Sequence, residues 1–163
     1  MITGILIPQN EALPLEARQL DGLTDYQTAV GGWVEAIHIE KPSMTLFVNE
    51  EGKVRGLPRN SRATALWWLL SPSVRRMDMI VGEAVLIGSS RGRDTTSDLP
   101  STFHSLLMET AKYQVEVTNE RGRWQRDDRE FDSYFEAAIF AMLVVDRSNP
   151  FDSSETRVRV VAA

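Results

Sequence analysis

The chain of 163 residues contains no cysteine, and this absence removes several kinds of chemistry. Disulfide bonds, thiolate catalysis, iron–sulfur clusters and zinc sites built on sulfur are all excluded. The two histidines, His38 and His104, are far apart in the sequence and neither belongs to a spacing typical of metal ligands. We therefore expect no metal and no cofactor, with stability coming from packing alone.

Long hydrophobic runs are also missing. The longest, residues 137–145, has nine residues, whereas a membrane-spanning helix needs roughly 20. The first eight residues are apolar but lack a basic start and a small-residue cleavage site, so we expect a β-strand there and a cytoplasmic protein. The formal net charge of −5 argues against general affinity for nucleic acid or for anionic membranes.

The first part of the chain predicts an α+β domain over residues 1–88, with a mixed or antiparallel sheet and two short helices. The first helix follows Thr24 as N-cap and ends at Gly31, and the second covers 61–70 after Asn60 or Ser61. We expect a turn at 49–52 in which Gly52 has a positive φ. Alternating or β-branched residues predict strands over 2–7, 13–18, 33–39, 44–48 and 79–87.

A polar stretch follows and predicts a linker over residues 89–102. Beyond it, residues 103–163 predict a second small unit in the order helix, hairpin, helix, strand. The expected elements are a helix over 103–111, strands at 113–117 and near Trp124, a helix over 131–145 and a strand over 157–161. The long helix would cover one face of a three-stranded sheet. The other face would carry Lys112, Gln114, Glu116, Arg157 and Arg159.

One stretch has the letters of a catalytic motif. Residues 88–92 match the G-x-S-x-G nucleophile elbow and follow a predicted strand. The helix that this motif requires does not follow, and the nearest acid and base, Asp98 and His104, are too close in sequence for the usual triad. We interpret the stretch as a polar loop and expect no enzyme active site.

The clearest electrostatic signal is a basic segment from Lys53 to Arg76. No Asp or Glu occurs between Gly52 and Met77, whereas six Lys or Arg residues do. A helix that begins near Asn60 would bring backbone N–H groups and arginines to one place, as in sites that hold a phosphate or a carboxylate. The predicted anion- or nucleotide-binding residues are Arg59, Asn60, Arg62 and Thr64. The alternative is that these arginines pair with acids nearby and solvate a face.

Two consecutive tryptophans occupy the same predicted helix. Positions one apart on a helix point about 100° away from each other, so the buried stripe accommodates Trp67 more easily than both rings. Trp68 then becomes a candidate anchor for a protein partner, although tryptophans at a half-buried edge position are more common than such anchors. With Trp68 we group three arginines of the basic segment as predicted partner-binding residues: Arg55, Arg75 and Arg76.

Five stretches of the chain carry a family resemblance: Gly4–Pro8, Tyr26–Glu35, Val48–Lys53, Gly56–Thr64 and Ile80–Val85. In order and spacing they resemble an uncharacterised family of short proteins encoded by bacteriophages, plasmids and other mobile elements. The resemblance covers about the first ninety residues, and the part after Gly88 lies outside it. That part is similar to a small helix-covered sheet appended to proteins of actinobacterial phages. The resemblance implies an origin and assigns no catalytic residue.

Two functions from different classes follow. The first is a non-enzymatic accessory protein of a phage or mobile element that binds a host protein, in host takeover or against host defence. The second is a binder of nucleic acid or of a nucleotide that uses the basic segment, together with the arginine-bearing sheet face of the second unit. A homodimer is compatible with either. Salt dependence separates the two, because phosphate contacts weaken steeply with ionic strength.

Overall fold

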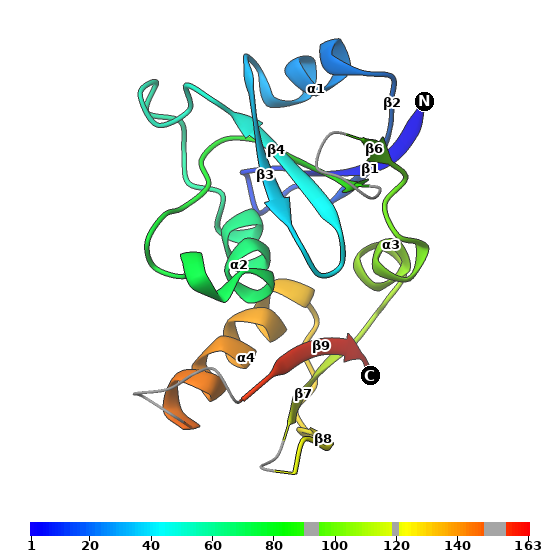
Figure 1. The fold of residues 1–163 in the computed structure, drawn as a ribbon, viewed down its shortest axis with the longest axis vertical. Helices are drawn as coiled ribbons and strands as arrows, with labels where there is room; N and C mark the ends of the chain where they lie inside the picture. The colour runs from blue at the N-terminus through cyan, green and yellow to red at the C-terminus, as the bar shows by residue number, and fades with distance from the viewer. Residues whose placement is uncertain (90–94, 119–120, 149–155) are drawn as a thin grey trace. The chain divides into compact units, whose positions relative to one another are not determined.

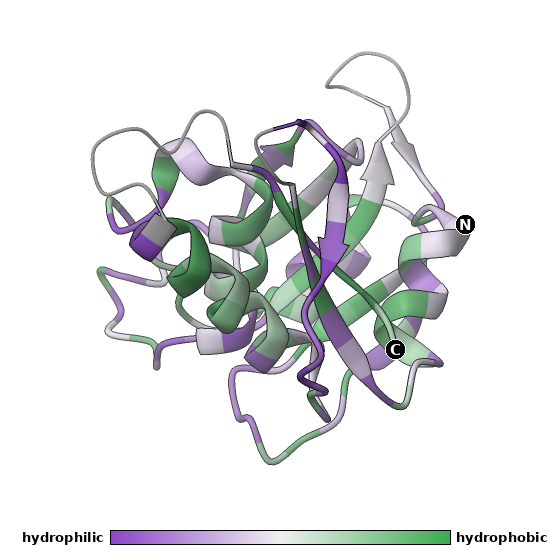
Figure 2. Cartoon of the chain, turned by 90° about the horizontal axis from the view of Figure 1, so that it is seen from below, coloured by the Kyte–Doolittle hydropathy of each residue, from purple (hydrophilic) through white to green (hydrophobic). Residues whose placement is uncertain are grey.

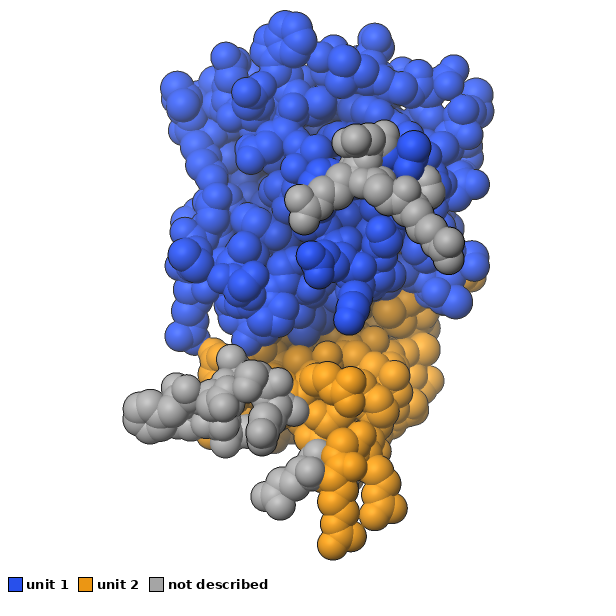
Figure 3. Space-filling view, in the orientation of Figure 1, with its two compact units in different colours: residues 1–104 blue, residues 105–163 orange. Residues whose placement is uncertain are grey.

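The computed structural model describes residues 1–89, 95–118, 121–148 and 156–163. The chain divides into two compact units, Met1–His104 and Ser105–Ala163, shown in different colours in Figure 3. The first holds a six-stranded sheet with helices and the second a three-stranded sheet with one helix, so the predicted α+β class is confirmed. Figure 2 shows hydrophobic residues concentrated in the helices and strands.

The sheet of the first unit is antiparallel throughout. β1 (Ile2–Ile7) pairs with β2 (Glu16–Leu20) on one side and with β5 (Ala84–Ser89) on the other. Next to β5 lie β4 (Met44–Asn49) and then β3 (Val34–Ile39) at the edge. The spatial order is therefore β2-β1-β5-β4-β3. Figure 1 shows the edge strand β3 next to β4.

Helices cover both faces of this sheet. α1 (Leu23–Val30) buries Tyr26 and Val30 in a cluster that Phe47 of β4 also joins. The next residue on β4, Val48, points to the opposite face, and it lines one pocket together with Trp67 of α2 (Ser61–Leu70). α1 and α2 therefore lie on either side of β3 and β4, as in Figure 1.

The two helices of the first unit differ in how they begin. α2 has the predicted bounds, and Asn60 is its N-cap, with Oδ1 accepting from the N–H of Ala63 at 3.0 Å. The predicted cap Thr24 is wrong, because α1 begins at Leu23 after Gly22 and has no side-chain cap. Its predicted end is confirmed, since Gly31 is left-handed with φ 72°. A short 3-10 helix, η1 (Pro72–Val74), follows α2.

Two strands are shorter or displaced relative to the prediction. β2 lies at 16–20 instead of 13–18, and β5 begins at Ala84 instead of residue 79. Residues 80–82 hydrogen-bond to the start of α2 instead of extending the sheet, because the N–H of Asn60 donates to Ile80 and the N–H of Gly82 to Pro58. Tertiary contacts thus decide where this strand starts.

The turn at 49–52 is present, with the N–H of Gly52 donating to the carbonyl of Asn49 at 3.1 Å. The predicted positive φ of Gly52 is wrong, since positive φ occurs instead at Gly56. Glycine fits position 52 for a different reason: a Cβ there would lie 2.9 Å from Cγ2 of Val81. The glycine allows a close approach of two segments.

The described part of the predicted linker is structured. β6 (Thr96–Ser97) pairs with the end of β5, and Leu99 is buried. α3 (Ser101–Met108) begins two residues earlier than predicted, and the division between the compact units falls within it, after His104. Among the described residues, no helix has the length and apolar character needed to span a membrane.

The second unit has the predicted element order. β7 (Tyr113–Thr118) lies between β8 (Trp124–Arg126) and β9 (Val158–Ala162), and α4 (Tyr134–Ser148) packs on β7 and β9. α4 begins three residues later than predicted, because Phe131 instead exchanges backbone hydrogen bonds with Tyr113.

Candidate functional site

Two of the predicted anion-binding residues are buried and form hydrogen bonds within the first unit. Asn60 is fully buried, and its amide donates to the carbonyls of Ile7 and Gly82, both at 2.9 Å. Thr64 is also buried, with Oγ1 accepting from the N–H of Ile80 at 3.0 Å. Asn60 thus ties the start of α2 to β1, and both side chains tie it to the segment 80–82.

The two arginines of the predicted anion site have different surroundings. The guanidinium of Arg62 donates to the carbonyls of Pro8, Asn10 and Leu13 at 2.7–3.1 Å, which fixes the segment between β1 and β2. Burial lowers the pKa of Arg62. Arg59 is exposed, and its side chain makes no hydrogen bond or ion pair with the residues that the structure describes.

The remaining basic residues of this segment contact different parts of the first unit. Lys53 pairs with Asp78 at 2.5 Å, and this hydrogen bond holds the pKa of the Asp78 carboxyl below its usual range. Arg55 donates to the carbonyl of Gly31, and Arg75 to that of Trp68. Arg76 is exposed and has a positive φ of 66°, which is uncommon for a residue with a side chain.

The tryptophan pair of α2 is divided as the helix geometry predicts. Trp67 is buried, with 8% exposure, whereas Trp68 is half-buried. The indole N–H of Trp68 donates to the carbonyl of Asp78 at 2.7 Å. A role of Trp68 in partner binding stays a prediction, and the structure gives this ring an anchoring role within the first unit.

An open pocket of about 290 Å³ lies between β3, β4, α2 and the segment 78–81. Its walls are polar and apolar in about equal parts, and Glu35, Glu50 and the Lys53–Asp78 pair supply charge. Glu35 and Glu50 form no ion pair with the described residues. The apolar lining residues are Ile37, Val48, Trp67, Met79, Ile80 and Val81.

Several residues that adjoin the pocket lining in the chain or through the backbone have exposed hydrophobic side chains. Trp33, Val54 and Met77 are 64%, 93% and 81% exposed, and Met79 of the pocket wall is 38% exposed. The carbonyl of Trp33 accepts from the N–H of Glu50, and Val54 and Met77 adjoin the paired Lys53 and Asp78. We call these four residues the Trp33 surface.

Sequence reasoning missed the Trp33 surface. Trp33 lies at the start of a predicted strand, where an aromatic residue is ordinary, and isolated methionines and valines carry no pattern. The glycines at 31 and 32, which end α1 just before Trp33, were the available signal that a loop displays this ring.

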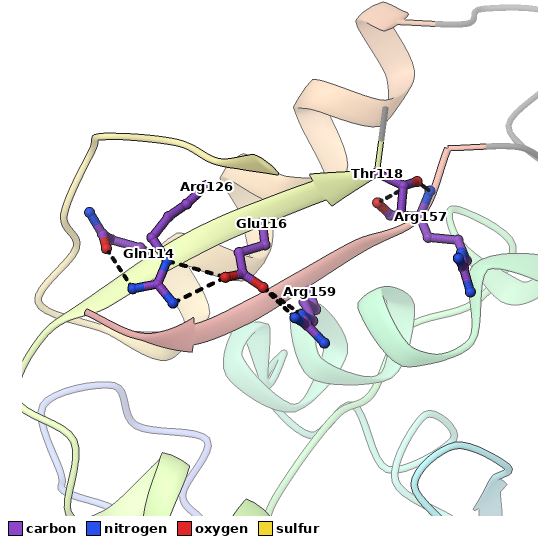
Figure 4. A network of polar contacts seen from close by, with 6 residues as sticks. All are labelled: Gln114, Glu116, Thr118, Arg126, Arg157 and Arg159. Atoms are coloured by element: carbon purple, nitrogen blue, oxygen red, sulfur yellow. Dashed lines mark hydrogen bonds and ion pairs between the residues drawn. The ribbon is translucent and has the colours of Figure 1, made fainter. Parts of the chain in front are cut away.

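The second unit carries a polar sheet face, as the sequence predicts. Glu116 of β7 is 8% exposed, and its two carboxylate oxygens accept from Arg126 of β8 and from Arg159 at 2.6–3.2 Å. Gln114 accepts from the same Arg126 at 3.4 Å. Figure 4 shows this network, which crosses all three strands. Lys112 pairs instead with Asp132.

The Glu116 network predicts a pH dependence. Burial opposes ionisation of Glu116, but the hydrogen bonds from Arg159 and Arg126 outweigh burial and hold its pKa below the usual value. Ionised Glu116 therefore stabilises the fold above about pH 4.5, and this stabilisation is lost as the pH falls through the lowered pKa. We expect Glu116→Gln to cost about 1–2 kcal/mol at neutral pH, since both arginines are half exposed.

Urea unfolding of both proteins at neutral and at acid pH checks this expectation. The difference between wild type and Glu116→Gln should shrink at acid pH. The matched control is Glu109→Gln, which changes an exposed glutamate of the same unit. A difference that is the same at both pH values would contradict the assigned role of Glu116.

Among the described residues, no three His, Asp or Glu side chains form a group that could hold a metal ion. Of the G-x-S-x-G letters, residues 90–92 lie outside the described part of the chain. The carboxylate of Asp98 accepts from the N–H of Thr3 at 2.6 Å, which gives this acid a structural role.

Comparison with known proteins identifies a family and no closer relative. No curated protein and no solved structure matches the chain. A family model described as a domain of unknown function, DUF3846, matches residues 2–116. The match continues past Gly88 through α3 and into β7, so the predicted limit of about ninety residues was too short. Because the family model matches more than half of the residues of this chain, the chain belongs to the DUF3846 family.

Proposed function

We propose that this chain is a non-enzymatic accessory protein of a bacteriophage or mobile element, and that it acts by binding a protein of the bacterial host. The observation that carries the proposal is the Trp33 surface beside an open pocket in the first unit. The origin in a phage or mobile element rests on the resemblance of the first ninety residues.

Groups of exposed apolar side chains, unlike single ones, are typical of binding surfaces. A tryptophan that is 64% exposed leaves a large apolar area in water, and Val54 and Met77 add to it. Tryptophan is also enriched among the residues that dominate the binding energy of protein interfaces. Burying Trp33 against a partner would therefore supply a hydrophobic driving force that the isolated chain does not use.

The residues that line the pocket indicate which kind of partner side chain would fit it. The apolar residues of its lining fit an aliphatic or aromatic stem, and the carboxylates of Glu35 and Glu50 favour a positive charge at the end of that stem. A lysine or arginine side chain combines both properties, because its methylene stem packs on apolar surface while its charge stays near water. We infer that the host protein presents a basic side chain to this pocket.

The second candidate function is binding of nucleic acid or a nucleotide through the basic segment. One observation favours it: Arg59 is exposed, lacks a described side-chain partner and directly precedes the cap of α2. The side chains of the other predicted residues already form hydrogen bonds within the first unit. These residues are Asn60, Arg62 and Thr64. Protein binding is therefore the better supported function.

Affinity capture from a lysate of the bacterial host tests the proposal, followed by measurement of the dissociation constant for the captured protein. We expect wild type to retain one protein at about 0.5 M salt, where surface charge contacts are strongly screened. Trp33→Ala should weaken this binding about tenfold or more, as expected for an anchor residue. The matched control is Leu23→Ala, an exposed apolar residue of α1, and it should bind like wild type.

Three results would contradict the proposal. Equal binding by Trp33→Ala and wild type would remove the Trp33 surface from the interface. Recovery that disappears with nuclease and weakens in Arg59→Glu would support the second candidate function. Sedimentation that shows a dimer in wild type and a monomer in Trp33→Ala would assign the surface to self-association instead.

A further inference from the structure

The polar face of the small sheet in the second unit is the strongest remaining feature. Strand register places Trp124 beside Thr118 and Arg126 beside Glu116, while Arg159 lies on the other side of Glu116. The N–H and the carbonyl of Arg157 bond to Thr118, which puts a third arginine at the end of the same face. Three guanidinium groups therefore share this face with one carboxylate, within a chain whose net charge is −5.

The aromatic ring of Trp124 lies among these arginines. The guanidinium carbon of Arg159 is 4.1 Å from the ring centroid, and that of Arg157 is 5.6 Å from it. Trp124 is 36% exposed, and the side chains of Arg126 and Arg159 are about half exposed. Flat cationic and aromatic groups thus lie next to one another on an accessible sheet surface.

Glu116 holds two of the guanidinium groups in place, and some of their N–H groups remain available to a ligand. Each of its oxygens accepts from one arginine, which fixes both guanidinium groups in place without using all of their N–H groups. The Arg157 side chain lies outside these hydrogen bonds. An anion at this face would therefore meet pre-positioned donors and a local excess of positive charge.

We propose that this face binds single-stranded nucleic acid, with phosphates on the three arginines and a base stacked on the Trp124–arginine group. Unpaired bases stack on aromatic rings and on guanidinium planes, whereas the bases of a duplex are hidden from a flat sheet. The acidic chain as a whole disfavours non-specific duplex binding, which needs broad positive charge. This site lies in the second unit and is independent of the Trp33 surface.

The test is fluorescence anisotropy of the full chain with labelled oligothymidylate and oligouridylate of about 20 nucleotides. We expect binding of at least one of them, with an affinity that falls as salt rises. Trp124→Ala should weaken binding about tenfold, the typical effect of removing one stacked base. Arg157→Glu should weaken it as well and lower the slope of log affinity against log salt by about 0.7 for each phosphate that the variant no longer binds.

Matched variants keep the result interpretable. Arg157→Glu leaves the Glu116 hydrogen bonds in place, so it tests the face even if Trp124→Ala disturbs the fold. Arg18→Glu makes the same charge change at an exposed position of the first unit that belongs to no predicted binding site, and it should bind within about twofold of wild type.

The proposal is overturned if neither oligonucleotide binds or if Arg157→Glu binds like wild type. Stronger binding to duplex of the same length would also overturn it. Full displacement by an equal concentration of polyglutamate would assign the face to an acidic protein segment. Because Trp33→Ala should leave oligonucleotide binding unchanged, failure here is distinguishable from failure of host-protein binding.

Discussion

Replacing Asn60 with alanine is expected to lower the free energy of unfolding by about 4 kcal/mol, because the variant loses the helix cap and the buried amide that donates to two carbonyls. Asn60 is fully buried, caps Ala63, and donates to Ile7 and Gly82. One side chain thus joins β1, α2 and the segment before β5. Urea unfolding monitored by tryptophan fluorescence measures the decrease.

Two further variants identify the cause. Asn60→Asp keeps an oxygen for the cap but places a carboxylate oxygen against the two carbonyls, so it should be at least as unstable as Asn60→Ala. Asn10→Ala is the control, because the side chain of Asn10 accepts a similar backbone hydrogen bond in an exposed turn. It should cost less than about 0.5 kcal/mol. If Asn60→Asp were as stable as wild type, the amide would not hold these carbonyls.

Replacing Gly88 with alanine is expected to cost about 3 kcal/mol through overpacking and weakened backbone pairing. A Cβ at Gly88 would lie 2.1 Å from the carbonyl oxygen of Asp98, which cannot move without displacing β6. The same segment buries Leu99, whose N–H donates to the carbonyl of Thr3 at 3.0 Å. The pairing of β6 and the Leu99 hydrogen bond should loosen together.

Hydrogen exchange at the Leu99 amide, combined with urea unfolding, checks this result. We expect protection at Leu99 to fall in Gly88→Ala. The control Gly56→Ala places a side chain at a φ of 66° with open space around it, so it should cost only about 1 kcal/mol and leave Leu99 protected. Unchanged protection in Gly88→Ala would show that the 96–99 segment does not pack on β5 as described.

The two predictions differ in how far the sequence anticipates them. The sequence identifies Asn60 as a candidate cap, because a cap is local and depends on residues three positions apart. Its two other bonds reach residues 53 and 22 positions away, and no local pattern encodes them. The same long-range contacts explain why an anion site predicted from Arg59, Asn60, Arg62 and Thr64 has most of its polar groups committed to the fold.

The sequence determined the class of the fold, the bounds of α2, the presence of β3 and β4, and the polar face around Glu116, because each depends on spacing along one or two neighbouring elements. Only the tertiary structure decided that β5 starts at Ala84 and that the 96–99 segment packs on Gly88. It also decided that Trp33 is exposed beside a pocket. These features arise where segments distant in the chain compete for the same backbone hydrogen bonds and the same space. A local sequence pattern does not encode which of these segments forms the contact.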